Sequence, residues 1–377
     1  MLKKLFIALG LIVAIGLFLY QNNMNSWRMI YKKDLKAIYE ILKENHPGFY
    51  DDQNPEFKAW LISGYAQALH KADQITSSVG YLDGLQFFVN GFKDNHLRLI
   101  YDPVVFGSDD LSKAPKGEVL LASVKELGPQ QVWVTIPSFY PQSTEEEDAL
   151  KNIISLMPKY KDNKFIIFDV RGNKGGNSHY GTQILENLYG EQYCNACFKR
   201  LRAKQYVEWR ASQGNIGYLK ELLITLEKRF GKGDVVTEFS VIISEMEKNL
   251  IVDNPFYRSL NNSVETAEVP ISENHLNARV VVITDSYCAS ACLDFLDELF
   301  VLGPVLQVGL PTNVDTNYLE CRDVVLPSSL ATLHFPIKVF RNRSRKSNQA
   351  HTPQVYVEDI YNDEELKRII FSSVGLE

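Results

Sequence analysis

A serine and a histidine are the side chains of this sequence best placed for nucleophilic chemistry. Ser290 lies between two alanines in the run Cys-Ala-Ser-Ala-Cys at 288–292, after an apolar segment and before a helical pattern. A hydroxyl at a helix start faces the positive end of the helix dipole, which favours developing negative charge. His96 lies where a helical pattern gives way to a strand-like one, and catalytic groups often occupy such positions. A serine and a histidine together would form a nucleophile and its general base.

Each residue also has a simpler interpretation. Serine is a preferred N-cap, so Ser290 could serve only to cap its helix. A lone histidine is more often structural than catalytic. His179, just past a glycine-rich turn, competes with His96 for the role of base. The positive form of a histidine is disfavoured at a helix start, so we rank His179 below His96.

The glycine-rich turn is a candidate anion site. The segment 165–177 begins as an apolar strand and ends in a turn with Gly172, Gly175 and Gly176, and a helical pattern follows over about 180–188. Glycine permits φ > 0 and close approach of another group to the backbone. Backbone N–H groups there could hold a phosphate or an oxyanion. The phosphate motifs Gly-x-Gly-x-x-Gly and Gly-Lys-Ser/Thr are absent, which favours the oxyanion, with a purely structural turn as the alternative.

Composition excludes several functional classes. The 377 residues carry a net charge of −6, which argues against a nucleic-acid binder. Five cysteines are too few for a disulfide scaffold. Cys194 and Cys197 form a lone Cys-x-x-Cys, which predicts a local disulfide or two free thiols, and Cys288 and Cys292 are expected to pack as small apolar residues. No His/Cys/Asp/Glu cluster has ligand spacing, so we expect no metal and no other cofactor.

The N-terminus reads as a membrane anchor or signal segment over residues 1–22. Lys3 and Lys4 precede a nearly unbroken apolar run over 5–20, and no Ala-x-Ala cleavage site follows. We expect an uncleaved anchor with its positive end in the cytoplasm. The rest of the chain would then be extracytoplasmic, in the periplasm or at the cell surface.

The elements that must position these residues fall into two predicted parts. Helical periodicity predicts an N-terminal helical subdomain over 28–97, with His96 next to its last residue. Strands alternating with helices predict an α/β core over 98–377 with a parallel sheet. Within it, the charged and mostly helical segment 193–276 is expected to form a cap-like insertion.

Three stretches, in this order, resemble the C-terminal-processing (tail-specific) serine peptidase family. Asp-Val-Arg-Gly-Asn-Lys-Gly-Gly at 169–176 is similar to that family's Asp-Leu-Arg-x-Asn-x-Gly-Gly. The Ala-Ser-Ala run at 289–291 matches the family's nucleophile run, and Gly-Leu-Pro-Thr at 309–312 matches a following Gly-x-Pro-Thr. Upstream, Asp-Asn-His at 94–96 is similar to the histidine of the branch that uses a Ser-His pair. The resemblance covers roughly residues 30–357 and implies a crotonase-like or Clp-protease-like core.

The chain departs from the better-known branch of that family. That branch has a lysine base shortly after Gly-x-Pro-Thr, whereas here no lysine follows until Lys338. The segment between His96 and Phe165 consists of predicted core elements, so it has no room for the usual PDZ domain. Leu293 replaces a glutamate often found three residues after the nucleophile. These departures favour a Ser-His pair over a Ser-Lys pair.

The resemblance implies a serine peptidase acting on a protein or peptide substrate. Ser290 would attack the scissile carbonyl, His96 would take its proton, and the N–H groups of Ala291 and of Gly175 or Gly176 would hold the oxyanion.

A third group should orient the histidine. In the Ser-His branch it is a glutamate, and its place is held here by Asn348 and Gln349, with Glu320 as another candidate. Two other functions use the same fold. They are a non-catalytic ligand- or peptide-binding protein, and acyl-CoA chemistry, which does not explain the export segment. Retention of both Ser290 and His96 favours the peptidase.

Overall fold

The computed structural model describes residues 26–103, 106, 120–260, 274, 276–373 and 375. They divide into two compact units. The first unit comprises Met1–Pro115, Val207–Ser259 and Tyr318–Arg341, and the second Lys116–Tyr206, Leu260–Asn317 and Asn342–Glu377. The predicted anchor at 1–22 lies outside the described residues. Within the described ranges, no helix is long and apolar enough to cross a membrane.

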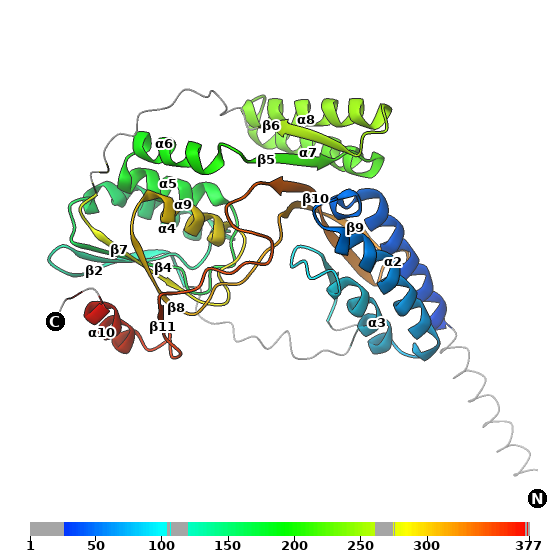
Figure 1. Ribbon diagram of the computed structural model, residues 1–377, viewed down its shortest axis with the longest axis horizontal. Coiled ribbons are helices and arrows are strands. Elements are labelled where there is room, and N and C mark those ends of the chain that lie inside the picture. Colours follow the sequence, from blue (N-terminus) through cyan, green and yellow to red (C-terminus); the bar gives the residue numbers. More distant parts are fainter. Residues whose placement is uncertain are drawn as a thin grey trace, which may run out of the picture. The chain divides into compact units, whose positions relative to one another are not determined.

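A six-stranded sheet forms the centre of the second unit, in the order β11-β8-β7-β4-β3-β2 (Figure 1). Its strands are β2 (Ser123–Gly128), β3 (Gln131–Thr135), β4 (Phe165–Asp169), β7 (Arg279–Thr284), β8 (Val305–Gly309) and β11 (Val355–Tyr356). All neighbours pair in parallel except β2, which pairs antiparallel with β3 at the edge. The prediction of a parallel sheet is therefore confirmed.

Helices cover both faces of this sheet. They are α4 (Thr144–Leu156), η3 (Met157–Tyr160), α5 (Ser178–Tyr189), α6 (Glu191–Arg202), α9 (Ala291–Leu302) and α10 (Asp363–Ser373). Ile166 and Phe168 of β4 share a core with α4, α5, α6 and α9, whereas Phe165 and Ile167 share another with α10. Strands buried on both faces have apolar residues at every position, which explains the unbroken apolar run of β4.

The register of β4 and β7 decides where the site forms. The two strands run in parallel, with Asp169 opposite Ile283, so their carboxyl ends meet at one edge of the sheet. The glycine turn follows β4, and the turn that carries Ser290 follows β7. In parallel sheets this edge is the usual place for ligands and reacting groups. Two turns far apart in the sequence thus become neighbours.

The first unit contains a five-stranded sheet of its own, in the order β1-β10-β5-β6, with β9 paired to β10. Its strands are β1 (Arg98–Tyr101), β5 (Tyr206–Arg210), β6 (Phe256–Leu260), β9 (Tyr318–Val325) and β10 (Ala331–Arg341). Its helices are one over residues 26–45, η1 (Pro47–Tyr50), α2 (Pro55–His70), η2 (Lys71–Gln74), α3 (Ser78–Asn90), α7 (Gln213–Phe230) and α8 (Asp234–Ile251). Alternate residues of β10, such as Leu333 and Phe335, are fully buried against these helices.

The predicted boundaries of 28–97 and 98–377 do not coincide with these units. The strands β1, β5, β6, β9 and β10 all lie within the predicted range 98–377, yet they belong mainly to the unit that contains the N-terminal helices. The expected cap at 193–276 is divided as well. Its α6 packs in the second unit, while β5, α7, α8 and β6 belong mainly to the first. Strand pairing joins segments distant in sequence, and local periodicity does not reveal such pairs.

Candidate active site

Ser290 occupies a strained backbone conformation at the start of α9. Its φ is 54° and its ψ is −121°, a region that non-glycine residues rarely adopt. Its side chain makes no capping hydrogen bond to α9. The simpler interpretation of Ser290 as a helix cap is therefore wrong. Strained residues persist where their surroundings hold them, and they cluster at active sites. A serine on a sharp strand-to-helix turn is also the arrangement of a nucleophile elbow.

Gly175 brings the glycine turn into direct contact with Ser290. Its φ is +94°, and a Cβ at this position would lie 2.8 Å from the Ser290 Cβ, 2.6 Å from the Ala289 oxygen and 2.8 Å from the Ala291 nitrogen. Only glycine allows such an approach. Gly176 instead faces Phe139, where a Cβ would meet the carbonyl group at 2.3 Å. The structure thus brings Gly175, Ser290 and Ala291 together.

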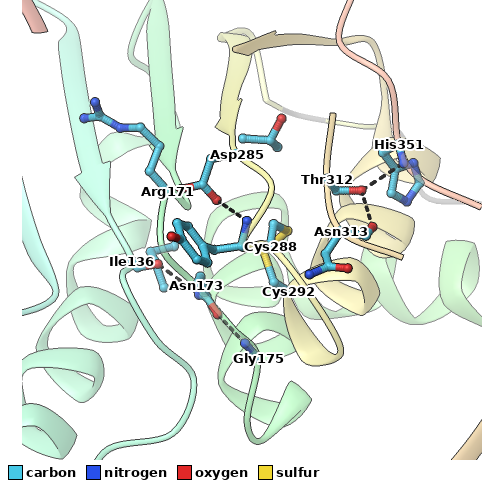
Figure 2. The surroundings of a disulfide bond; sticks show 12 residues. Ile136, Arg171, Asn173, Gly175, Asp285, Cys288, Cys292, Thr312, Asn313 and His351 are labelled. Atoms are coloured by element: carbon cyan, nitrogen blue, oxygen red, sulfur yellow. Dashed lines mark hydrogen bonds between the residues drawn. A yellow bond between two sulfur atoms is a disulfide. The ribbon is translucent and has the colours of Figure 1, made fainter. Parts of the chain in front are cut away.

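Asn173 connects the two turns from a fully buried position (Figure 2). Its amide donates to the Ile136 oxygen at 2.9 Å, and its Oδ1 accepts the Gly175 N–H at 2.9 Å. Its own carbonyl accepts the Ala289 N–H at 3.2 Å. The contacts with Gly175 and Ala289 fix backbone groups next to Ser290. The asparagine of the sequence motif is therefore a structural link between the two turns.

A second link starts from Asp285, directly after β7. Its Oδ2 accepts the Gly172 N–H at 2.8 Å, and its Oδ1 accepts the Tyr287 N–H at 2.9 Å. Burial raises the pKa of this carboxyl, although the backbone N–H groups act in the opposite direction. Asp285 therefore joins the beginning of the turn that carries Ser290 to the beginning of the glycine turn.

The backbone N–H groups of Ala291, the first residue of α9, and of Gly176 are among those in this region that donate to no other group in the described part of the chain. The Gly175 N–H is already engaged by Asn173. The positive end of the α9 dipole lies at Ala291, so an anion near this residue is stabilised.

Cys288 and Cys292 form a disulfide across the turn that carries Ser290, with a Cα–Cα distance of 5.4 Å. Both pack in the apolar core at the start of α9, as predicted, but the prediction did not include the bond, which forms because the first turn of α9 brings residue 292 within bonding distance of residue 288. Figure 2 shows the bond beside the two turns. Cys194 and Cys197 are buried free thiols, which is one of the two predicted states.

Asp169 and Arg171 form a bidentate ion pair just after β4. The Arg171 Nε lies 2.8 Å from Asp169 Oδ1, and its second terminal nitrogen lies 2.6 Å from Oδ2. The same guanidinium also contacts Asp363 of α10 at 2.9 Å. The pair therefore links the start of the glycine turn, directly after β4, to α10.

His96 lies in the first unit, immediately before β1. Its backbone N–H donates to Asp94 Oδ1 at 2.9 Å, and the same oxygen lies 3.9 Å from the His96 Nδ1. This Nδ1 is buried and has no hydrogen-bond partner among the described residues. The His96 side chain is 16% exposed. One ring nitrogen therefore lies near a carboxylate, while the side chain as a whole stays partly accessible to solvent.

His46 lies behind Asp94 and is fully buried. Its Nδ1 accepts the Gly48 N–H at 2.9 Å, and its ring stacks on Phe57 at a centroid distance of 4.3 Å. Burial lowers the pKa of His46, which favours the neutral ring. With Nδ1 acting as an acceptor, the ring proton is on Nε2, which lies 3.6 Å from Asp94 Oδ2. Asp94 therefore lies between two imidazoles.

The model of peptidase family S41 matches residues 132–356. This range is more than half of the chain, and it contains both the glycine turn and Ser290. The chain belongs to peptidase family S41. It is accordingly a serine-type peptidase of the C-terminal-processing protease family. His96 lies outside the matched residues.

Several solved structures are similar to the chain at low sequence identity, and the two with a TM-score above 0.5 share its fold. Mature CPAF is 12% identical with a TM-score of 0.55, over 90% of this chain and 97% of that one. Mature CPAF complexed with lactacystin is also 12% identical with a TM-score of 0.55, over 92% of this chain and 99% of that one. A lipoprotein from Streptococcus agalactiae is 12% identical with a TM-score of 0.44, over 89% of this chain and 95% of that one. No curated protein matches the chain.

The three residues predicted to orient His96 have other contacts in this S41 peptidase. The Glu320 carboxylate lies 3.2 Å from Lys338 Nζ. In the second unit, the Gln349 Oε1 accepts the Lys346 N–H at 3.0 Å, and the Asn348 N–H donates to the Asp315 oxygen at 2.7 Å.

Asp94 and His46 were missed as functional candidates. The Asp-x-His spacing was a signal for Asp94, because an aspartate two residues before a histidine can accept its N–H. For His46 the sequence contains no comparable signal.

His179 is exposed at the start of α5, and its backbone N–H donates to Asn177 Oδ1 at 3.1 Å. Its ring makes no hydrogen bond within the described residues. No group of three or more His, Cys, Asp and Glu residues in the described ranges could hold a metal ion.

Proposed function

We propose that this S41 peptidase is an extracytoplasmic serine endopeptidase in which Ser290 is the nucleophile and His96 the general base. The observation that carries the proposal is the conformation of Ser290. Its backbone is held at φ 54°, its side chain caps nothing, and Gly175 touches it. The Asp-x-His resemblance and the ring of His96, one nitrogen of which faces a carboxylate, support the choice of base.

The proposed reaction begins when the Ser290 Oγ attacks the scissile carbonyl carbon and His96 takes the hydroxyl proton. The new oxyanion accepts hydrogen bonds from the N–H groups of Ala291 and Gly176, since the Gly175 N–H is engaged. The imidazolium then gives its proton to the leaving amine, and the peptide bond breaks. Water, activated by the same imidazole, hydrolyses the resulting acyl-enzyme.

Asp94 is the best-supported residue for orienting His96. Its Oδ1 already accepts the His96 N–H and lies 3.9 Å from the ring, while its Oδ2 faces the neutral His46. Catalytic hydrogen bonds are often long without substrate and shorten in the complex. Asp94 would therefore take the orienting role predicted for Asn348, Gln349 or Glu320.

The proposed compartment rests on two features. The segment 1–22 predicts a membrane anchor, and the Cys288–Cys292 disulfide is typical of an oxidising environment. The substrate would then be an exported protein or peptide. A peptide map of the protein purified from its native compartment under thiol-blocking conditions tests this. Free thiols at both positions would contradict the assignment.

Two serine variants, one at the proposed nucleophile and one at a helix cap, test the role of Ser290. Ser290→Ala should abolish labelling by a fluorophosphonate probe and hydrolysis of denatured casein, with the free energy of unfolding nearly unchanged, because Ser290 caps nothing. Ser143 is the matched control, since it caps α4 by accepting the Glu146 N–H at 3.2 Å. Ser143→Ala should cost about 0.5–2 kcal/mol of stability and keep the activity. Labelling that persists in Ser290→Ala would refute the assignment, and an unreactive wild type would favour the binding-protein alternative.

The same labelling and casein-hydrolysis assays test whether His96 is the general base. His96→Gln should lower the turnover by about 10²–10⁴-fold, because general-base catalysis contributes on that order. His179→Gln is the control and should leave turnover unchanged, because its ring is exposed and makes no hydrogen bond within the described residues. Near-wild-type rates in His96→Gln together with an inactive His179→Gln would reverse the assignment.

A further inference from the structure

A disulfide encloses the proposed nucleophile. Cys288 precedes Ser290 by two residues and Cys292 follows it by two, so the bond closes a small ring with the serine at its centre. Both cysteines are fully buried, and both belong to the core that packs α5 and α9 against the sheet. A disulfide placed in this way restrains the nucleophile itself.

Both ends of this ring are anchored in the second unit. The Cys288 N–H donates to the Asp285 oxygen at 3.2 Å, and the Cys288 carbonyl accepts the Asn313 N–H at 3.0 Å. The Cys292 N–H donates to the Ala289 oxygen at 3.1 Å, and Cys292 lies in the first turn of α9. The disulfide thus ties the loop after β7 directly to a helix whose apolar face is buried.

The conformation of Ser290 needs such a restraint. Left-handed backbone is unfavourable for a residue with a Cβ, and no capping hydrogen bond from the Ser290 side chain stabilises it. A covalent ring removes many alternative conformations of the enclosed residues. Without the bond, the chain between residues 288 and 292 could relax to ordinary dihedral angles, which would move the Ser290 hydroxyl.

We propose that Cys288 and Cys292 are positioning residues whose disulfide holds Ser290 in its reactive conformation. This inference rests on the proposed function, because it gives Ser290 the nucleophile's role. Because both cysteines are buried, attack by an external thiol is hindered in the folded protein. The bond therefore acts as a permanent restraint on the nucleophile and not as a rapid switch.

Two double variants separate positioning from simple loss of packing. Cys288→Ala/Cys292→Ala removes the disulfide, and Cys194→Ala/Cys197→Ala removes two buried thiols from the same core without breaking a bond. The disulfide variant should lose roughly tenfold to hundredfold in kcat and in the maximal rate of fluorophosphonate labelling, with little change in KM. The thiol variant should keep both rates. All assays run well below the midpoint of unfolding of each variant.

A measurement on the wild-type chain covers the case in which the disulfide variant does not fold. Excess dithiothreitol reduces the bond during brief exposure to mild urea. The disulfide breaks, two cysteine thiols form, and the reagent is oxidised to its cyclic disulfide. After anaerobic removal of urea and reagent, peptide mapping confirms two thiols at 288 and 292. Labelling should then be slow, and reoxidation should restore it.

Two results would overturn the inference. One is labelling of the reduced protein or the disulfide variant within threefold of the wild-type rate. The other is a native, fully active protein that carries free thiols at both positions. The proposed function fails separately, when the oxidised wild type is not labelled at Ser290 at all.

Discussion

Replacing Gly175 with alanine tests the contact on which the site depends. The added Cβ would lie within 2.8 Å of three groups of the nucleophile turn, and two of them, the Ala289 oxygen and the Ala291 nitrogen, are backbone atoms. Backbone atoms cannot rotate away as a side chain does. The two turns must therefore separate by several tenths of an ångström, and Ser290 must move with its turn.

The expected magnitude has two parts. A Cβ at φ +94° costs about 1–2 kcal/mol, because the left-handed region crowds it against its own backbone. Forcing an extra methyl group into a close contact costs about 1–3 kcal/mol more. Gly175→Ala should therefore lower the free energy of unfolding by about 2–5 kcal/mol. Displacement of a reacting group by about 1 Å costs on the order of 10²-fold in rate, so kcat should fall by about that factor.

Gly190 provides a matched control. It has the same φ of +94°, but a Cβ there would meet nothing within 4 Å. Gly190→Ala should cost only the backbone part, about 1–2 kcal/mol, and leave kcat unchanged. Urea unfolding of both variants gives the stabilities, and fluorophosphonate labelling gives the reactivity of Ser290. If Gly175→Ala matches Gly190→Ala in kcat within threefold, the close contact between the two turns is refuted.

The remaining predictions concern the histidines of the first unit. Asp94→Asn keeps an acceptor for the His96 N–H but removes the carboxylate, so kcat should fall at least tenfold with KM unchanged, and an unchanged kcat would exclude Asp94 as the orienter. Burial lowers the pKa of His46, so below about pH 6.5 the unfolded chain binds a proton that the folded chain does not. This stability is full above about pH 6.5 and is lost as the pH falls, by up to about 1.4 kcal/mol per pH unit. Urea unfolding between pH 7 and 5 should therefore show a steeper loss in the wild type than in His46→Gln, and equal slopes would contradict the buried neutral ring.

The nucleophile turn was largely predictable from sequence, because its signals are local. Ser290 among small residues and the glycine turn after an apolar strand are each visible within a dozen residues. Their proximity followed from a parallel sheet, in which the ends of neighbouring strands meet. The disulfide was not predictable in the same way. Cys288 and Cys292 could as well have packed separately, and the local turn geometry decides between the two outcomes.

The division of the chain into two units could not be predicted from local sequence patterns, for a different reason. The segments 207–259 and 318–341 look, by periodicity, like further parts of an α/β core or its cap. What assigns them to the first unit is pairing with β10, which itself pairs with β1 more than two hundred residues earlier in the chain. Pairing partners at such separations leave no trace in the hydrophobic pattern of either strand.

The groups that surround Ser290 mainly restrain its backbone and are not reactive themselves. Asn173 fixes the turn by hydrogen bonds, Gly175 by close contact, and the disulfide by a covalent ring. None of these groups transfers a proton or an electron pair in the proposed reaction. They matter because a strained residue relaxes unless its surroundings hold it by more than one route. An enzyme that relies on a preorganised nucleophile and oxyanion site needs such contacts to hold both in place. The residues most sensitive to substitution should therefore extend well beyond Ser290 and His96, to groups that never touch the substrate.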